Sequence, residues 1–287
     1  MATLTLVHLS DLHFHALPRG LKEWASKRLL GALNWTLKRR RQYPLERYRR
    51  LLEAVRSRPW DHLLISGDLT QLALEDEFRQ ARDALAPLLE GSAPVSIIPG
   101  NHDRYVSEAC EPDRFQAHFG PWHTSEPSPL PGAREVLWRE LGPGWRLLGW
   151  DSTHPNDWLS ASGTVFRETL EASEALLGSL APETQVVLMN HYPLWFPEGW
   201  RVHARHELLN LESVREWVWS QPRIRVYLHG HVHRNWHLHL QRPGGTPLDV
   251  VNSASSTMIP RSGTESSFHQ IELLDSGGVR VEPRFLT

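Results

Sequence analysis

The feature that most constrains this chain is the alternation of short apolar runs, rich in Val, Ile and Leu, with longer segments of helical periodicity. Such short runs are typical of strands that are buried on both faces of a sheet. The expected strands are 4–9, 62–66, 95–98, 146–150, 185–189, 223–228 and 248–251, and the expected helices are 45–56, 75–90, 168–180 and 211–219. Alternation of the two element types predicts an α/β fold.

The length and composition favour one domain. With 287 residues, 40% of them hydrophobic, the chain can build a sizeable core, and we expect a single domain over residues 1–287. A hairpin is expected at the end, where strand-like runs 268–274 and 279–285 flank an Asp-Ser-Gly-Gly turn. Two segments read as insertions or loops: the Pro-rich stretch 121–132 and a basic stretch at about 15–50.

Several classes of protein are disfavoured by composition. Cys110 is the only cysteine, so no internal disulfide is expected and a reducing cytoplasm fits. The N-terminal residues lack the pattern of a signal peptide, and no run approaches the roughly 18 apolar residues of a spanning helix. A net charge of −2 indicates no overall preference for nucleic acid or anionic membranes. We expect a cytoplasmic protein, with any peripheral contact to the inner membrane face made by a local patch.

Polar side chains that can bind metals follow five of the expected strands. They are Asp11, His13, Asp68, Asn101, His191, His231 and His233. Because ligands in open α/β sheets bind at the carboxyl ends of the strands, these side chains are expected to converge. Mixed imidazole, carboxylate and amide ligands suit Mn, Fe or Zn better than Mg or Ca.

The motifs that carry these residues are Asp-x-His, Gly-Asp, Gly-Asn-His-Asp, a lone His and Gly-His-x-His, in that order. This set resembles the calcineurin-like metallophosphoesterase superfamily over residues 8–235. The resemblance implies a four-layer αββα sandwich of two mixed sheets, with a dimetal site at the C-terminal ends of the strands. It assigns one metal to Asp11, His13 and His233. It assigns the other metal to Asn101, His191 and His231, with Asp68 as the bridge.

The resemblance also implies a reaction. Two divalent transition metals, with Mn²⁺ expected and Fe or Zn as alternatives, clamp a phosphoryl group and lower the pKa of a bridging water. His102 follows Asn101 without being a ligand in the family pattern, which makes it the candidate general acid. Asp103 is expected to orient His102 or to stabilise its charge. The alternative for Asp103 is a helix N-cap before Arg104.

Three functions are candidates for a chain with these motifs. The first is a phosphodiesterase of a small substrate, similar to the class III cyclic-nucleotide phosphodiesterases. The second is a pyrophosphatase of a lipid-linked nucleotide, similar to the UDP-2,3-diacylglucosamine hydrolases. The third, a non-catalytic scaffold, is disfavoured because a scaffold needs no complete set of metal ligands. Phosphomonoesterase and protein phosphatase activities stay open.

The basic stretch 19–50 contains eleven basic residues and two acidic ones. Leu30, Leu33 and Leu37 recur at helical spacing, with Trp24 and Trp35 nearby. This pattern predicts a basic amphipathic helix that guides anionic substrates or contacts a membrane surface. A solvated helix packed through its leucines is the alternative. No nucleic-acid partner is expected, because no recognition motif accompanies the charge.

For several other histidines, tryptophans and loop residues, the sequence leaves the role open or favours a structural one. His154, residues 252–255, Trp195 and Trp200 could line or cover the site, or could pack their own loops. We expect structural or surface roles for His8, His15, His62, His229, His237 and His239.

Overall fold

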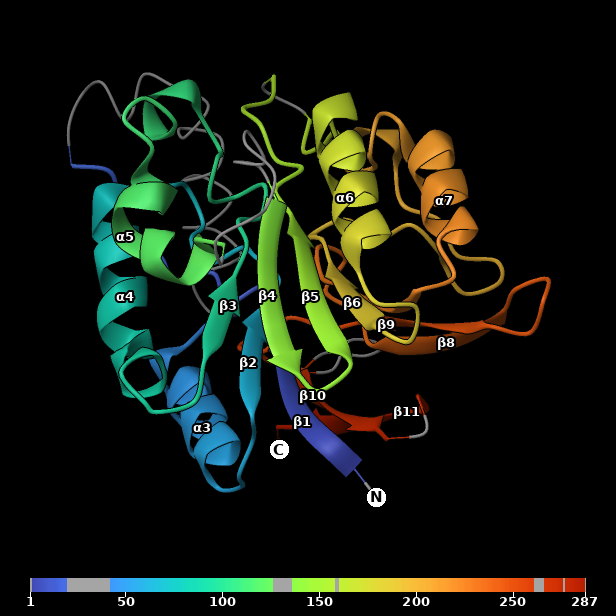
Figure 1. Ribbon diagram of the computed structural model, residues 1–287. Coiled ribbons are helices and arrows are strands. Elements are labelled where there is room, and N and C mark those ends of the chain that lie inside the picture. Colours follow the sequence, from blue (N-terminus) through green and yellow to red (C-terminus); the bar gives the residue numbers. More distant parts are fainter. Residues whose placement is uncertain are drawn as a thin grey trace.

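The computed structural model describes residues 2–19, 42–125, 136–157, 160–260, 266–275 and 277–286. In this part of the chain, two sheets lie between helices (Figure 1). The first sheet has the order β11-β10-β1-β2-β3. Its strands are β1 (Ala2–Leu9), β2 (His62–Ile65), β3 (Val95–Ile97), β10 (Ser267–Leu274) and β11 (Val279–Phe285).

The second sheet has the order β4-β5-β6-β7-β9-β8. Its strands are β4 (Val136–Gly142), β5 (Trp145–Trp150), β6 (Gln185–Met189), β7 (Ile224–His229), β8 (Trp236–Gln241) and β9 (Pro247–Asn252). Both sheets are mixed: β1, β2 and β3 run parallel, as do β5, β6, β7 and β9, whereas β10, β11, β4 and β8 pair antiparallel. Parallel neighbours require crossover connections, and helices supply several of them here.

Three hydrophobic layers hold the sheets and helices together. Between the sheets, Leu6 and Leu64 of the first sheet share one buried cluster with Val187 and Leu228 of the second. The outer face of the first sheet is covered by α3 (Leu45–Arg56), α4 (Glu75–Leu89) and α5 (Arg114–His123). The outer face of the second is covered by α6 (Arg167–Ser179) and α7 (Leu211–Ser220). The predicted four-layer αββα sandwich is therefore confirmed.

Among the described α-helices and strands, α5, β4 and β8 were not predicted. The first residues of the expected loop 121–132 belong to α5. This helix forms because Asp113 caps it by accepting a hydrogen bond from the backbone N–H of Gln116, and because Phe115 and Phe119 are buried on its inner face. Pro121 therefore lies in the last turn of a helix. Residues 126–135 lie outside the described residues.

The basic stretch is described only at its ends. Arg19 pairs with Asp76 over 2.8 Å, and α3 begins at Leu45. Residues 20–41, with the leucines, the tryptophans and most of the basic residues on which the amphipathic-helix prediction depends, lie outside the described residues. Among the residues that are described, no helix has the length and apolar character needed to cross a membrane.

Candidate metal centre

The loops after the strands hold an unusual backbone conformation. Asp11, His13, Asp68, His231 and His233 all have positive φ angles, between 49° and 73°. Residues other than glycine rarely adopt this left-handed region, and each costs of the order of 1 kcal/mol or more, so such residues persist where surrounding structure and function require them. Five of the seven predicted ligands thus occupy strained positions that turn their side chains toward one point.

Two glycines of the motifs make room for this arrangement. A Cβ atom on Gly100 would lie 2.2 Å from Asp68 Oδ1. A Cβ atom on Gly230 would lie 1.8 Å from Ser10 Oγ and 2.3 Å from Asp11 Oδ2. Only glycine allows the backbone to approach the carboxylates this closely.

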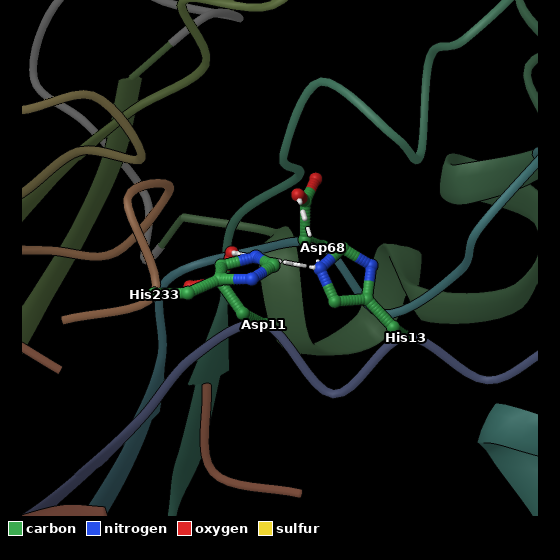
Figure 2. Close-up of side chains that lie close together, drawn as sticks. All are labelled: Asp11, His13, Asp68 and His233. Carbon is green, nitrogen blue, oxygen red and sulfur yellow. Dashed lines mark hydrogen bonds and ion pairs between the residues drawn. The ribbon is translucent and has the colours of Figure 1, made fainter. Parts of the chain in front are cut away.

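One half of the site is formed by Asp11, His13, Asp68 and His233, whose side chains point toward one another in Figure 2. One ligand atom from each lies within 4.8 Å of the others. His233 Nε2 is 3.1 Å from Asp11 Oδ1 and 2.9 Å from His13 Nε2. The first three side chains are buried and that of His233 is 20% exposed, so the group opens to solvent on one side.

The other half is formed by Asn101, His191 and His231. Asn101 Oδ1 lies 3.1 Å from His191 Nε2 and 2.8 Å from His231 Nδ1. Asp68 connects the halves, because its Oδ2 is 3.5 Å from His191 Nε2 and 3.8 Å from His13 Nε2. The structure therefore brings all seven predicted residues together.

The hydrogen bonds of three imidazoles test whether the group fits a metal. The outward ring nitrogens of His13, His191 and His231 lie 3.2, 2.8 and 2.8 Å from the backbone carbonyls of Thr70, Ser66 and His206. Because a neutral imidazole has one N–H, which these carbonyls accept, the lone pair of the other nitrogen points inward. These lone pairs face one another and two carboxylates, and all of these groups repel one another. A cation at their centre would remove the repulsion. The residues present fit a divalent metal pair.

The pKa values of two histidines of the site shift in opposite directions. Burial lowers the pKa of His231 to about 3, which keeps that ring neutral. Burial also opposes charge on His191, but the nearby Asp68 carboxylate outweighs it and raises the pKa of His191 to about 9. The carboxylates therefore attract any cation, a proton included, to the junction of the two halves.

His102 lies at the edge of this group. Its ring stacks on Tyr105 at 5.5 Å between centroids and meets His13 edge-on at 5.0 Å. Its Nδ1 is 2.6 Å from the carbonyl oxygen of Gln71. This contact and the stacking fix the ring beside the site.

The predicted action of Asp103 on the imidazole of His102 does not match this geometry. The buried Asp103 carboxylate accepts hydrogen bonds from the backbone N–H groups of Leu69, Thr70 and Gly100, and from Thr70 Oγ1, at 2.8 to 3.2 Å. These donors occupy both carboxylate oxygens, so Asp103 ties the loop after β2 to the loop after β3. No described helix begins at Arg104 either, so Asp103 is not a helix N-cap.

A family model for calcineurin-like phosphoesterases matches residues 4–235. The chain belongs to this family. Membership supports a metal-dependent hydrolase of phosphoric esters with a dinuclear metal site. No curated protein matches the chain.

Solved structures share the fold of this calcineurin-like phosphoesterase at low identity. A dimetal phosphatase from Danio rerio is 14% identical, with a TM-score of 0.62, and the match covers 100% of this chain and 99% of that one. A purple acid phosphatase from yellow lupin is 15% identical, with a TM-score of 0.59, and the match covers 98% and 51%. A putative 5'-nucleotidase from Staphylococcus aureus is 13% identical, with a TM-score of 0.54, and the match covers 98% and 53%. This chain thus spans about half the length of the last two.

Residues outside the motifs also hold the centre of this phosphoesterase in place. Ser255 and Thr257 donate to the backbone carbonyls of Asp11 and Leu12, at 2.6 and 2.7 Å. Residues 252–255 are buried and support the Asp11 loop, so they do not line the mouth of the site as one reading proposed. The hydroxyl of Tyr43 lies 3.3 Å from His233 Nδ1. No sequence spacing connects these residues to the motifs, because the contacts join distant parts of the chain.

The tryptophans after His191 support the packing alternative. Trp195 packs against Trp219 and Tyr227, and Trp200 packs against Trp236. His8 and His62 are buried between strands, where they contact Ser66 and Ser96. His237 and His239 share Asp249 at the edge of the second sheet, and His154 contacts Thr164 in its own loop. His8, His62, His237 and His239 therefore have the structural partners expected of residues outside the ligand set, whereas contact of His154 with substrate stays a prediction.

Proposed function

We propose that this phosphoesterase is a phosphodiesterase that hydrolyses a small phosphodiester with two Mn²⁺ ions, for which Fe or Zn could substitute. The observation that carries the proposal is the inward lone pairs of His13, His191 and His231 around the shared Asp68. Bound metals would supply positive charge to the phosphoryl oxygens and a water of lowered pKa.

His102 is proposed as the general acid. With Nδ1 committed to the Gln71 carbonyl, the protonated ring would donate from Nε2 to the departing oxygen. The backbone N–H of His102 donates to Asp68 Oδ1 at 2.8 Å, which ties the acid to the residue shared by the two halves. Asp103 is proposed to act indirectly, by holding the loop that carries His102.

The test compares an ester pair with the same leaving group. Purified protein is loaded with Mn²⁺ and assayed on bis-p-nitrophenyl phosphate and on p-nitrophenyl phosphate, with Asp68→Asn as the inactive control. We expect a higher kcat/KM for the diester, and loss of both activities in excess EDTA. Higher efficiency on the monoester would make the protein a phosphomonoesterase, and full activity without metal would refute the metal-dependent mechanism.

A further inference from the structure

A pocket of about 250 Å³ opens beside the metal centre, between the loop after β1 and the start of α3. Its walls include Leu12, Phe14, Tyr43, Leu45 and Tyr48. An apolar cavity of about 150 Å³ is enough to admit a benzene ring, so this pocket is large enough for an organic group. The rest of the lining comes from His13, His15, Pro44, Gln80 and Thr257.

The pocket borders the metal-ligand group, because the two have a residue in common. The metal-ligand candidate His13 forms part of its wall. Tyr43 lines it too, and the Tyr43 ring meets that of His13 at 5.1 Å while its hydroxyl reaches His233 Nδ1. A group in the pocket would therefore lie close to a phosphoryl group at the metals, next to the rings of His13 and Tyr43.

The chemistry of the walls favours an uncharged occupant. The hydroxyls of Tyr43, Tyr48 and Thr257 are directed to His233 Nδ1, the Ala84 carbonyl and the Leu12 carbonyl. Among the described residues that line the pocket, none carries a carboxylate, ammonium or guanidinium group, and the titratable side chains there, besides the tyrosine phenols, are the imidazoles of His13 and His15. Phe14 and Tyr48 meet edge to face at 5.1 Å, which leaves aromatic and aliphatic surface toward the cavity.

We infer that this pocket receives an uncharged, apolar substituent of the substrate, an alkyl or aryl group attached to the phosphoryl centre. The inference rests on the proposed function, because it takes the phosphoryl group to be bound at the metals. It specifies a substrate that combines one reacting phosphoryl group with an apolar group, and it disfavours a second phosphate on this side of the site.

A series of n-alkylphosphonates, from methyl to octyl, tests the inference. Each has one phosphonate head for the metals and one chain, so there is no ambiguity about which substituent enters the pocket. The compounds are measured as inhibitors of bis-p-nitrophenyl phosphate hydrolysis by the Mn²⁺-loaded protein. We expect the inhibition constant to fall about three- to four-fold per added methylene, until the chain exceeds the pocket.

Two substitutions at the rim locate the effect. Leu45 is 56% exposed at the start of α3, and Gln80 is exposed on α4, so Leu45→Asp and Gln80→Glu should both fold. Each places a charge at the pocket, and we expect roughly ten-fold weaker inhibition by octylphosphonate with no change for methylphosphonate. Phe166→Asp is the matched control, because Phe166 is 42% exposed at the start of α6 and does not line the pocket.

Calorimetry gives a readout independent of turnover. Binding of octylphosphonate should show a more negative heat-capacity change than binding of methylphosphonate, and Leu45→Asp should reduce the difference. Equal inhibition constants from methyl to octyl would overturn the inference, as would equal effects of Leu45→Asp and Phe166→Asp. Such results would leave the proposed function intact, since that function is tested separately, by the loss of activity in EDTA and by the preference for the diester over the monoester.

Discussion

At the scale of single residues, the orientation of the imidazoles depends on backbone carbonyls that belong to other loops. The carbonyls of Ser66, Thr70 and His206 each lie beside one ring nitrogen, which leaves the other nitrogen with its lone pair toward the centre. His102 follows the same rule through Gln71, but its ring stands at the edge of the ligand group. Because of this position, we expect variants of His102 to keep the metals and variants of the ligand histidines to lose them.

Replacement of His102 should slow turnover without releasing metal. We expect His102→Ala to reduce kcat by about 10²- to 10⁴-fold, the usual contribution of a general acid, while His191→Ala loses activity together with metal. The reduction should shrink for esters with good leaving groups, which need less protonation. Rates are compared across phenyl esters of graded leaving-group pKa, with metal content measured for each variant. The same relative loss for every ester would show that His102 is not the acid.

A second prediction concerns Glu77, a fully buried carboxylate. It accepts from the backbone N–H groups of Ala16, Gln71, Leu72 and Leu74. Burial raises the pKa of Glu77 to about 7, although these four donors oppose the shift. Between the ordinary pKa of 4.5 and about 7, the folded protein thus binds more protons than the unfolded chain, and stability falls as the pH rises.

The expected loss from this site is about 3 kcal/mol between pH 4.5 and pH 7, with no further loss above that window. Glu77→Gln cannot ionise, so its free energy of unfolding should lack this component. Denaturant unfolding of both proteins at several pH values measures the difference. A wild-type protein that gains stability relative to Glu77→Gln as the pH rises through this window would contradict the prediction.

At the scale of elements, the site depends on turns between strand and loop. Strands β2, β3 and β7 are followed by Gly67-Asp68, Gly100-Asn101 and Gly230-His231. The backbone of Asp68 and of His231 is in the left-handed conformation. Glycines 100 and 230 lie against carboxylates where no Cβ atom fits. In these two motifs, the glycine is therefore required because the backbone passes so close to a carboxylate, and the residue after it is required as a metal ligand.

Gly230→Ala should distort the metal site while leaving the secondary structure in place. The new methyl group would overlap Ser10 Oγ and the Asp11 carboxylate, so we expect Mn²⁺ affinity to fall at least about ten-fold. Gly178→Ala is the control, because that glycine lies in α6 with no atom within 4 Å of a new Cβ, and alanine favours a helix by about 1 kcal/mol. Titration calorimetry with Mn²⁺ measures both. Unchanged affinity in Gly230→Ala would mean that the loop relaxes freely.

Many of the strands and the positions of the ligand motifs could be predicted from the sequence. Buried parallel strands such as β6 form continuous apolar runs, and the ligand motifs follow these runs directly. The edge strands β4 and β8 could not be recognised in the same way: Arg139 and Glu140 interrupt β4, and β8 alternates His237 and His239 with apolar residues. The role of Asp103 also escaped prediction. It depends on which backbone N–H groups surround a carboxylate in space, and adjacency to His102 in the sequence does not reveal them.

At the scale of the whole molecule, both sheets contribute to the metal centre. Asp11, Asp68 and Asn101 follow strands of the first sheet, whereas His191 and His231 follow strands of the second. Metals bound here would link the two layers. We propose that the chain unfolds as one unit, in keeping with a single domain.

Metal removal should accordingly lower the stability of the whole protein. Ligands that bind only the folded state stabilise it by about 2.7 kcal/mol at 100 times Kd, so Tm should rise with Mn²⁺ concentration and fall in EDTA. Scanning calorimetry measures this, and metal analysis should give two ions per chain. Asp68→Asn, which alters the shared carboxylate, should respond weakly. A Tm that is identical with Mn²⁺ and with EDTA would contradict the proposed link.

The pairing of β1 with β10 has a consequence for how the protein is made. The antiparallel partner of β1 is β10, which aligns Leu6 with Ile271 and is translated more than 250 residues after β1. The serine and threonine that hold the Asp11 loop, Ser255 and Thr257, are also translated more than 240 residues after it. A nascent chain therefore carries one unpaired apolar edge of β1 until β10 has been made, and the Asp11 loop gains its final supports only after Ser255 and Thr257 have been translated.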